Sequence, residues 1–88
     1  MEPLFRRTRL TKREVSRILE NFIDGKGDRW DWDDFVSGLS LEDDYLEKIR
    51  TRCDGLSEEF PPDKPGEYCN EQGREVIRGY IRELRNST

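Results

Sequence analysis

The chain has 88 residues, of which 41% are charged and 32% are apolar, and its formal net charge is −4. A chain of this length forms one domain that buries only ~60% of its unfolded surface, so we expect no deep active-site cavity. High charge is typical of disordered chains, but here the apolar residues recur with helical spacing, which predicts a folded domain.

The first helix is predicted over residues 11–23. Thr11 and Glu14 have the spacing of a capping box, in which each side chain accepts a hydrogen bond from the other residue's backbone N–H group. Leu10 and Val15 are spaced for a hydrophobic staple across the helix start. Apolar residues then recur every three or four positions until a glycine-rich turn ends the helix.

A short second helix is predicted to follow that turn, with Asp31 as its N-cap residue and Trp30 just before the cap. Trp32 lies on the apolar face of this helix, and we expect both tryptophans to face the core. Ser40 is predicted to cap a third helix, whose first turn is rich in acids. This third helix should end near Gly55.

Three prolines and a glycine between residues 57 and 69 predict a loop, which Phe60 and Tyr68 attach to the core. Asn70 is placed to cap a last helix of about fifteen residues. The predicted fold is an all-α bundle of about four helices, the second one short, at 11–86, preceded by a basic arm at 1–10. The predicted core residues are Ile18, Leu19, Phe22, Trp32, Phe35, Leu46, Ile49, Ile77, Tyr80 and Ile81.

The beginning of the chain shows no targeting signal. No early segment has the run of about seven apolar residues that a signal peptide requires, and none approaches the ~20 residues of a membrane-spanning helix. We therefore expect a cytoplasmic protein without membrane contact. In that compartment Cys53 and Cys69 are expected to be reduced, half-buried thiols.

The composition argues against an enzyme. The chain lacks histidine, which is the commonest general base and metal ligand. Its carboxylates gather in the first turns of predicted helices and not in a cleft with the differing environments that acid–base catalysis requires. Two cysteines without histidine do not complete a zinc site. We predict no catalytic residue, no cofactor and no metal.

Residues 24–35, DGKGDRWDWDDF, faintly resemble the calcium loop of an EF-hand. Counting from Asp24, Lys26 stands at the third position, where an oxygen ligand belongs. Arg29 replaces the glycine of the sixth position, and Phe35 replaces the bidentate glutamate of the twelfth. Calcium binding is therefore not expected.

An acidic central segment is the strongest functional signal. Residues 24–47 contain nine acids and two basic residues, a charge density that steers basic partners and repels acidic ones. We predict a non-enzymatic interaction domain that docks on or neutralises a basic protein, against the alternative that these acids only solubilise the chain. In size and charge, although in no motif, the chain resembles immunity proteins that block nuclease toxins. The predicted protein-binding residues are Asp28, Asp33, Asp34, Glu42, Asp43 and Glu47.

Nucleic-acid binding is the second hypothesis, and it rests on arginines at the two ends of the chain. A basic row along one helix can follow phosphates. Glu75 and Glu83 interrupt the row, however, and pairing of its arginines with the acids of the second and third helices is a simpler account. The residues of this hypothesis are Arg6, Arg7, Arg9, Arg74, Arg78 and Arg82.

Overall fold

The computed structural model describes residues 7–25, 29–38 and 40–87, and of residues 7 and 29–31 it describes only the backbone. The elements in chain order are β1 (Arg7–Thr8), α1 (Lys12–Asp24), α2 (Arg29–Ser37), β2 (Ser40–Leu41), α3 (Asp44–Asp54), α4 (Leu56–Glu59) and α5 (Glu71–Asn86). The predicted all-α bundle with a short second helix is confirmed. Over the described residues, α4 adds one turn, and β1 and β2 form a two-residue parallel pair.

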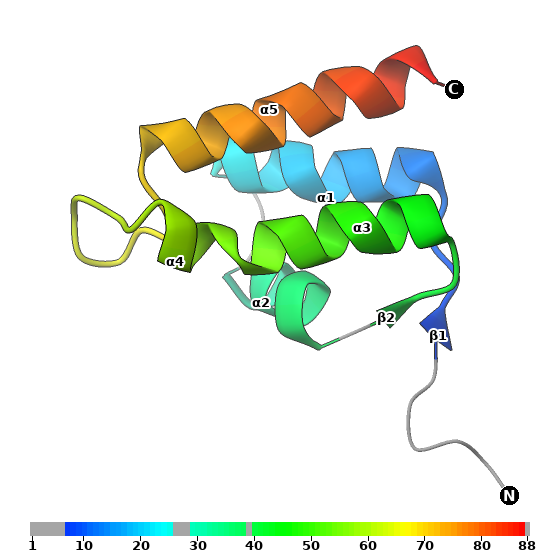
Figure 1. Ribbon diagram of the computed structural model, residues 1–88, viewed down its shortest axis with the longest axis horizontal. Helices are drawn as coiled ribbons and strands as arrows, with labels where there is room; N and C mark the ends of the chain where they lie inside the picture. The colour runs from blue at the N-terminus through cyan, green and yellow to red at the C-terminus, as the bar shows by residue number, and fades with distance from the viewer. Residues whose placement is uncertain (1–6, 26–28, 39, 88) are drawn as a thin grey trace, which may run out of the picture.

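Helices α1 and α5 lie side by side and run in opposite directions (Figure 1). Helix α3 runs alongside them, and α2 packs against α3 on the side away from α5. Charged residues on α2 and on α5 therefore lie on opposite sides of the bundle. This separation decides which charges can neutralise one another.

The start of α1 has the predicted capping box. The Glu14 amide donates to Oγ1 of Thr11 at 3.1 Å, and the Thr11 amide donates to Oε1 of Glu14 at 3.0 Å. Gly25 ends the helix with φ of 68°, a left-handed conformation that favours glycine because it has no Cβ. Asn70 caps α5 as predicted and accepts from the Gly73 amide.

Two predicted N-caps are wrong. Helix α2 begins at Arg29, so Asp31 lies inside it. An N-cap residue contributes only ~1 kcal/mol to helix stability. Tertiary packing, including that of Trp32 on Phe22, can therefore extend α2 by a turn beyond the predicted cap. Asp43 rather than Ser40 caps α3, because Ser40 and the next residue pair with β1.

The core is formed by side chains from α1, α2, α3, α4 and α5. Seven of the ten predicted core residues are buried, whereas Ile18, Phe22 and Tyr80 are partly buried at its edge. Residues between the helices also contribute to the core. One of them is Leu41 of β2, which is 1% exposed. Cys53 and Cys69 are unbridged and fully buried, not half-buried.

An aromatic cluster joins α1 and α2 to the loop before α5. Trp32 stacks on Phe22 with ring centroids 4.0 Å apart, and Tyr68 meets both rings edge-on. The Tyr68 hydroxyl reaches the carbonyl oxygens of Cys53 and Asp54 at the end of α3. The inward prediction holds for Trp32, which is 6% exposed, and the side chain of Trp30 lies outside the described residues.

Candidate protein-interaction surface

Helix α2 carries the first part of the predicted acidic surface. Asp33 and Asp34 are both exposed, because Trp32, Phe35 and Val36 take the positions that face the core. Among the described residues, neither carboxylate has a basic partner. Asp28, predicted beside them, lies outside the described residues. We call Asp33 and Asp34 the α2 cluster.

The start of α3 carries the second part, formed by Glu42, Asp43 and Asp44, which we call the α3 cluster. All three are exposed. Glu42 accepts from Nε of Arg9 at 3.1 Å, and Asp43 accepts from the Leu46 amide as N-cap residue. Asp44 makes no ion pair within the described part of the chain, and it is stabilised by the positive end of the helix macrodipole.

Glu47 differs from the other predicted acids because its carboxylate is already bound within the protein. Arg50 donates to both of its oxygens, from Nε at 2.7 Å and from Nη2 at 2.9 Å. The Leu41 amide donates to Oε1 at 2.9 Å. Nη1 of Arg50 also donates to the backbone carbonyl of Val36 at the end of α2. The pair therefore ties α2, β2 and α3 together.

The Glu47–Arg50 pair is strongly favoured in its charged form. Hydrogen bonds from Arg50, reinforced by the Leu41 amide, lower the pKa of Glu47 to about 2, although burial acts in the opposite direction. The same partner raises the pKa of Arg50. With a fourth hydrogen bond from Oγ of Ser40 at 3.4 Å, the acceptor positions of the carboxylate are occupied within the protein, so Glu47 supports the fold in this arrangement.

Arginines of α5 do not reach the acids of α2 and α3 in the way that the sequence suggested. Arg78 pairs with Glu71 and Glu75 of its own helix. Arg74 pairs with Glu71 at 3.7 Å and donates to the carbonyl of Ile23 at 2.9 Å. The sequence-based account of these arginines is wrong for Arg74 and Arg78, because α5 and α2 lie on opposite sides of the bundle (Figure 1).

Other residues of the nucleic-acid hypothesis are dispersed. Arg9 pairs with Glu42, and Arg82 is exposed without an ion pair among the described residues. Arg7 contributes its backbone to β1, and Arg6 lies outside the described residues. The structure therefore does not bring these side chains together into one described row.

Signs of catalytic or metal chemistry are few in the described ranges. They contain no cluster of three or more cysteine or acidic residues that could hold a metal ion, and no helix there is long and apolar enough to cross a membrane. Part of the EF-hand-like segment, residues 26–28, lies outside those ranges. Burial raises the pKa of Cys53 to about 12 and also raises that of Cys69, which makes both thiols poor nucleophiles.

Comparison with known proteins identifies no similar protein. The sequence matches no protein-family model, and no curated protein and no solved structure resembles it significantly. The candidate surface therefore rests on geometry and charge alone.

Sequence reasoning missed two residues of this region. The sequence predicts Asp44 as a first-turn acid and as an i,i+4 partner of Lys48, but the structure shows no such pair among the residues that it describes, and the exposure of Asp44 makes it part of the α3 cluster. Arg50 was not considered, because an arginine within an apolar stripe gives no sign that it is buried. The spacing of Glu47 and Arg50, three positions apart, is the one local signal that pointed to the pair.

Proposed function

We propose that the protein is a non-enzymatic interaction domain that docks on a basic protein through the α2 and α3 clusters. The observation that carries the proposal is that Asp33, Asp34 and Asp44 lie exposed within residues 24–47, which contain nine acids against two basic residues. Each is exposed, and none has a basic partner among the described residues. By contrast, Glu71 and Glu75 of α5 are paired with arginines of their own helix.

Electrostatics explains how such a surface selects its partner. Exposed carboxylates of one sign raise the association rate with a basic surface and disfavour an acidic one. The effect extends over a Debye length of about 8 Å at physiological ionic strength, so the two clusters need not touch. Exposed carboxylates also keep most of their hydration until contact, so the free protein avoids the cost of burying them.

Charge reversal tests the proposal directly. A triple variant, Asp33→Lys, Asp34→Lys and Asp44→Lys, spares Asp43 and Glu47, which support the fold. We expect this variant to lose a polypeptide that the parent chain captures from native extract both with and without nuclease treatment. Capture by the parent should weaken steeply as salt rises. Each captured species is identified as protein or nucleic acid.

A matched control carries the same change in charge at another exposed place. Glu58→Lys, Asp63→Lys and Glu67→Lys alter acids of α4 and the following loop, which are also exposed and without described ion pairs. This control should capture the same polypeptide as the parent. Equal loss in both triple variants would indicate a nonspecific charge effect, and capture of nucleic acid alone would replace the proposal with the second hypothesis.

A further inference from the structure

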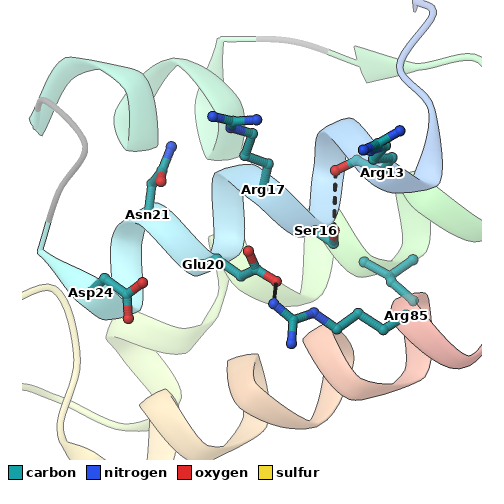
Figure 2. A pocket seen from close by; sticks show the side chains of 8 residues that line it. Arg13, Ser16, Arg17, Glu20, Asn21, Asp24 and Arg85 are labelled. Carbon is teal, nitrogen blue, oxygen red and sulfur yellow. Dashed lines mark hydrogen bonds and ion pairs between the residues drawn. The ribbon is translucent and has the colours of Figure 1, made fainter.

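A polar groove of about 550 Å³ is lined by residues of α1 and of the end of α5, none of which belongs to the α2 or α3 cluster (Figure 2). Small-molecule sites typically enclose about 300–1,000 Å³, so the groove has the size for such a ligand. Leu84 is its one apolar residue; the other side chains that line it are charged or polar. This lining favours a charged, hydroxyl-rich ligand over an apolar one.

Two arginines on α1 dominate one end of the groove. Arg13 and Arg17 are both exposed, and neither has an ion pair among the described residues. Arg85, on the other wall, pairs with Glu20, one of the two carboxylates that line the groove. The chain contains 20 acids and 16 basic residues, so a shortage of acids does not explain the unpaired arginines.

The positions of Arg13 and Arg17 oppose the stability of α1. Like charges four residues apart on a helix repel each other, and Arg13 also lies in the first turn, where the macrodipole disfavours a cation. Lys12 in the same turn has the Tyr45 ring 5.7 Å away, whereas Arg13 has no described compensating contact of this kind. An anion bound beside both guanidinium groups would remove the repulsion.

Donors and acceptors are separated along the groove. Arg13, Arg17 and Asn21 follow one another at intervals of four residues and extend to the same side of α1 (Figure 2). Guanidinium groups offer only donors, which suits phosphate oxygens. Asp24 supplies an exposed acceptor beyond them, ~10 Å along the helix from Arg17 at 1.5 Å per residue.

We propose that this groove binds a phosphate monoester with free hydroxyl groups, its phosphoryl group between Arg13 and Arg17 and its hydroxyls toward Asp24. Asn21 donates to the ester between them. Sugar phosphates and nucleoside monophosphates share this chemistry. The site is independent of protein docking through the α2 and α3 clusters, so the failure of one proposal leaves the other standing.

Titration of the whole chain at constant ionic strength tests the site, with inorganic phosphate, a pentose phosphate and adenosine monophosphate as probes. We expect Tm to rise continuously with the concentration of each probe, and the side-chain amide of Asn21 to shift in NMR spectra until the site is saturated. At least one ester should reach half-saturation at a several-fold lower concentration than inorganic phosphate. A preference for one of the two esters shows whether the ligand is a sugar phosphate or a nucleoside monophosphate. The absence of any saturable response to all three probes would overturn the proposal.

Three variants locate the site. Arg13→Gln with Arg17→Gln should lose the response, whereas Lys48→Gln with Arg82→Gln removes the same charge elsewhere and should retain it. Asp24→Asn should still bind inorganic phosphate but lose the preference for the ester. Equal responses of the two double variants would contradict the site. So would an unliganded Tm of the Arg13 and Arg17 variant below that of the parent, because it would reveal a structural role for the arginines.

Discussion

Arg50 of α3 and Arg78 of α5 both pair with glutamates, but their surroundings differ. The Arg50 side chain is 11% exposed and that of its partner Glu47 is 24% exposed, while Arg78 is 32% exposed and its partners Glu71 and Glu75 are 68% and 58% exposed. Water screens the second set and weakens it. The same pair of residue types therefore supports the fold on the α2–α3 side and contributes little on the α5 side.

Helices α1 and α5 rely on apolar contact instead. Val15 and Leu19 of α1 and Ile77 of α5 are fully buried, and these two helices share the most extensive contact of the fold. On the other side, the end of α2 is hydrogen-bonded by Arg50 and β2 is hydrogen-bonded by its partner Glu47, and no apolar residue can supply these bonds. The contrast leads to four measurements of stability, taken from the largest expected effect to the smallest.

Arg50→Met should have the largest effect. It leaves the Glu47 carboxylate without its cation and the Val36 carbonyl without its donor, and removing one member of a buried pair costs ~3–5 kcal/mol. Methionine keeps most of the apolar volume of the stem. The control Arg78→Met should cost less than ~1 kcal/mol. Urea unfolding measures the free energy of unfolding of both variants. Equal losses would contradict the distinction between the α2–α3 side and the α5 side.

Ile77→Ala probes the apolar interface of α1 and α5. Ile77 has no exposed surface, and truncation of a buried isoleucine costs ~2–5 kcal/mol. Ile49→Ala in α3, where the side chain is 1% exposed, should fall in the same range because both residues belong to one core. A loss below ~0.5 kcal/mol at either position in urea unfolding would show that this position does not contribute to the shared interior.

The Glu47–Arg50 pair should make stability depend on acid pH. The pKa of Glu47 is about 2 in the folded chain against an ordinary 4.5. A lowered pKa adds stability that is fully present above 4.5 and is lost as the pH falls through 2. A shift of this size corresponds to at most about 3.4 kcal/mol, because water screens the partly exposed pair.

The parent and Glu47→Gln should therefore differ most near neutral pH and converge as the pH approaches 2. Urea unfolding followed at several pH values between these limits measures the difference. A gap that stays constant over the whole range would show that the Glu47 charge does not stabilise the fold.

Two glycines of α5 should respond in opposite directions to alanine. A Cβ at Gly73 would lie 2.8 Å from the Cys69 sulfur and 2.9 Å from its Cβ, so Gly73→Ala should cost ~1–3 kcal/mol through overpacking. At Gly79 the nearest atom would be the mobile Arg82 guanidinium at 3.9 Å, so Gly79→Ala should gain up to ~1 kcal/mol from helix propensity. Thermal melting compares them; destabilisation at both positions would contradict the expected packing difference.

Much of the fold could be predicted because its signals are local. The helix caps, the glycines that end helices and the apolar spacing each involve residues within about one or two helical turns. Thr11 and Asn70 cap their helices as predicted for that reason. The prediction of Ser40 as a cap is wrong because its backbone pairs with β1, more than thirty positions earlier in the chain. No local pattern encodes that pairing.

The candidate surface could be predicted only in outline. Acid density was visible at once, but six acids chosen by density include Asp43, a cap, and Glu47, a partner of a buried arginine. Asp44 has the same side chain as Asp43, but only the Asp43 carboxylate accepts a hydrogen bond from the Leu46 amide, and Asp44 has no such partner among the described residues. Whether a carboxylate is paired depends on its distance from donors and cations in the fold. A single sequence does not give those distances.

The sequence by itself determined that the chain is helical, where most helices end and which faces are apolar, because hydrogen bonds and side-chain periodicity within a helix depend on near neighbours. Only the tertiary structure decided which charges remain unpaired. Coulomb energy depends on separation and burial, so the burial of Arg50 and the separation of α5 from α2 leave Asp33 and Asp34 without a basic partner in the part of the chain that the structure describes.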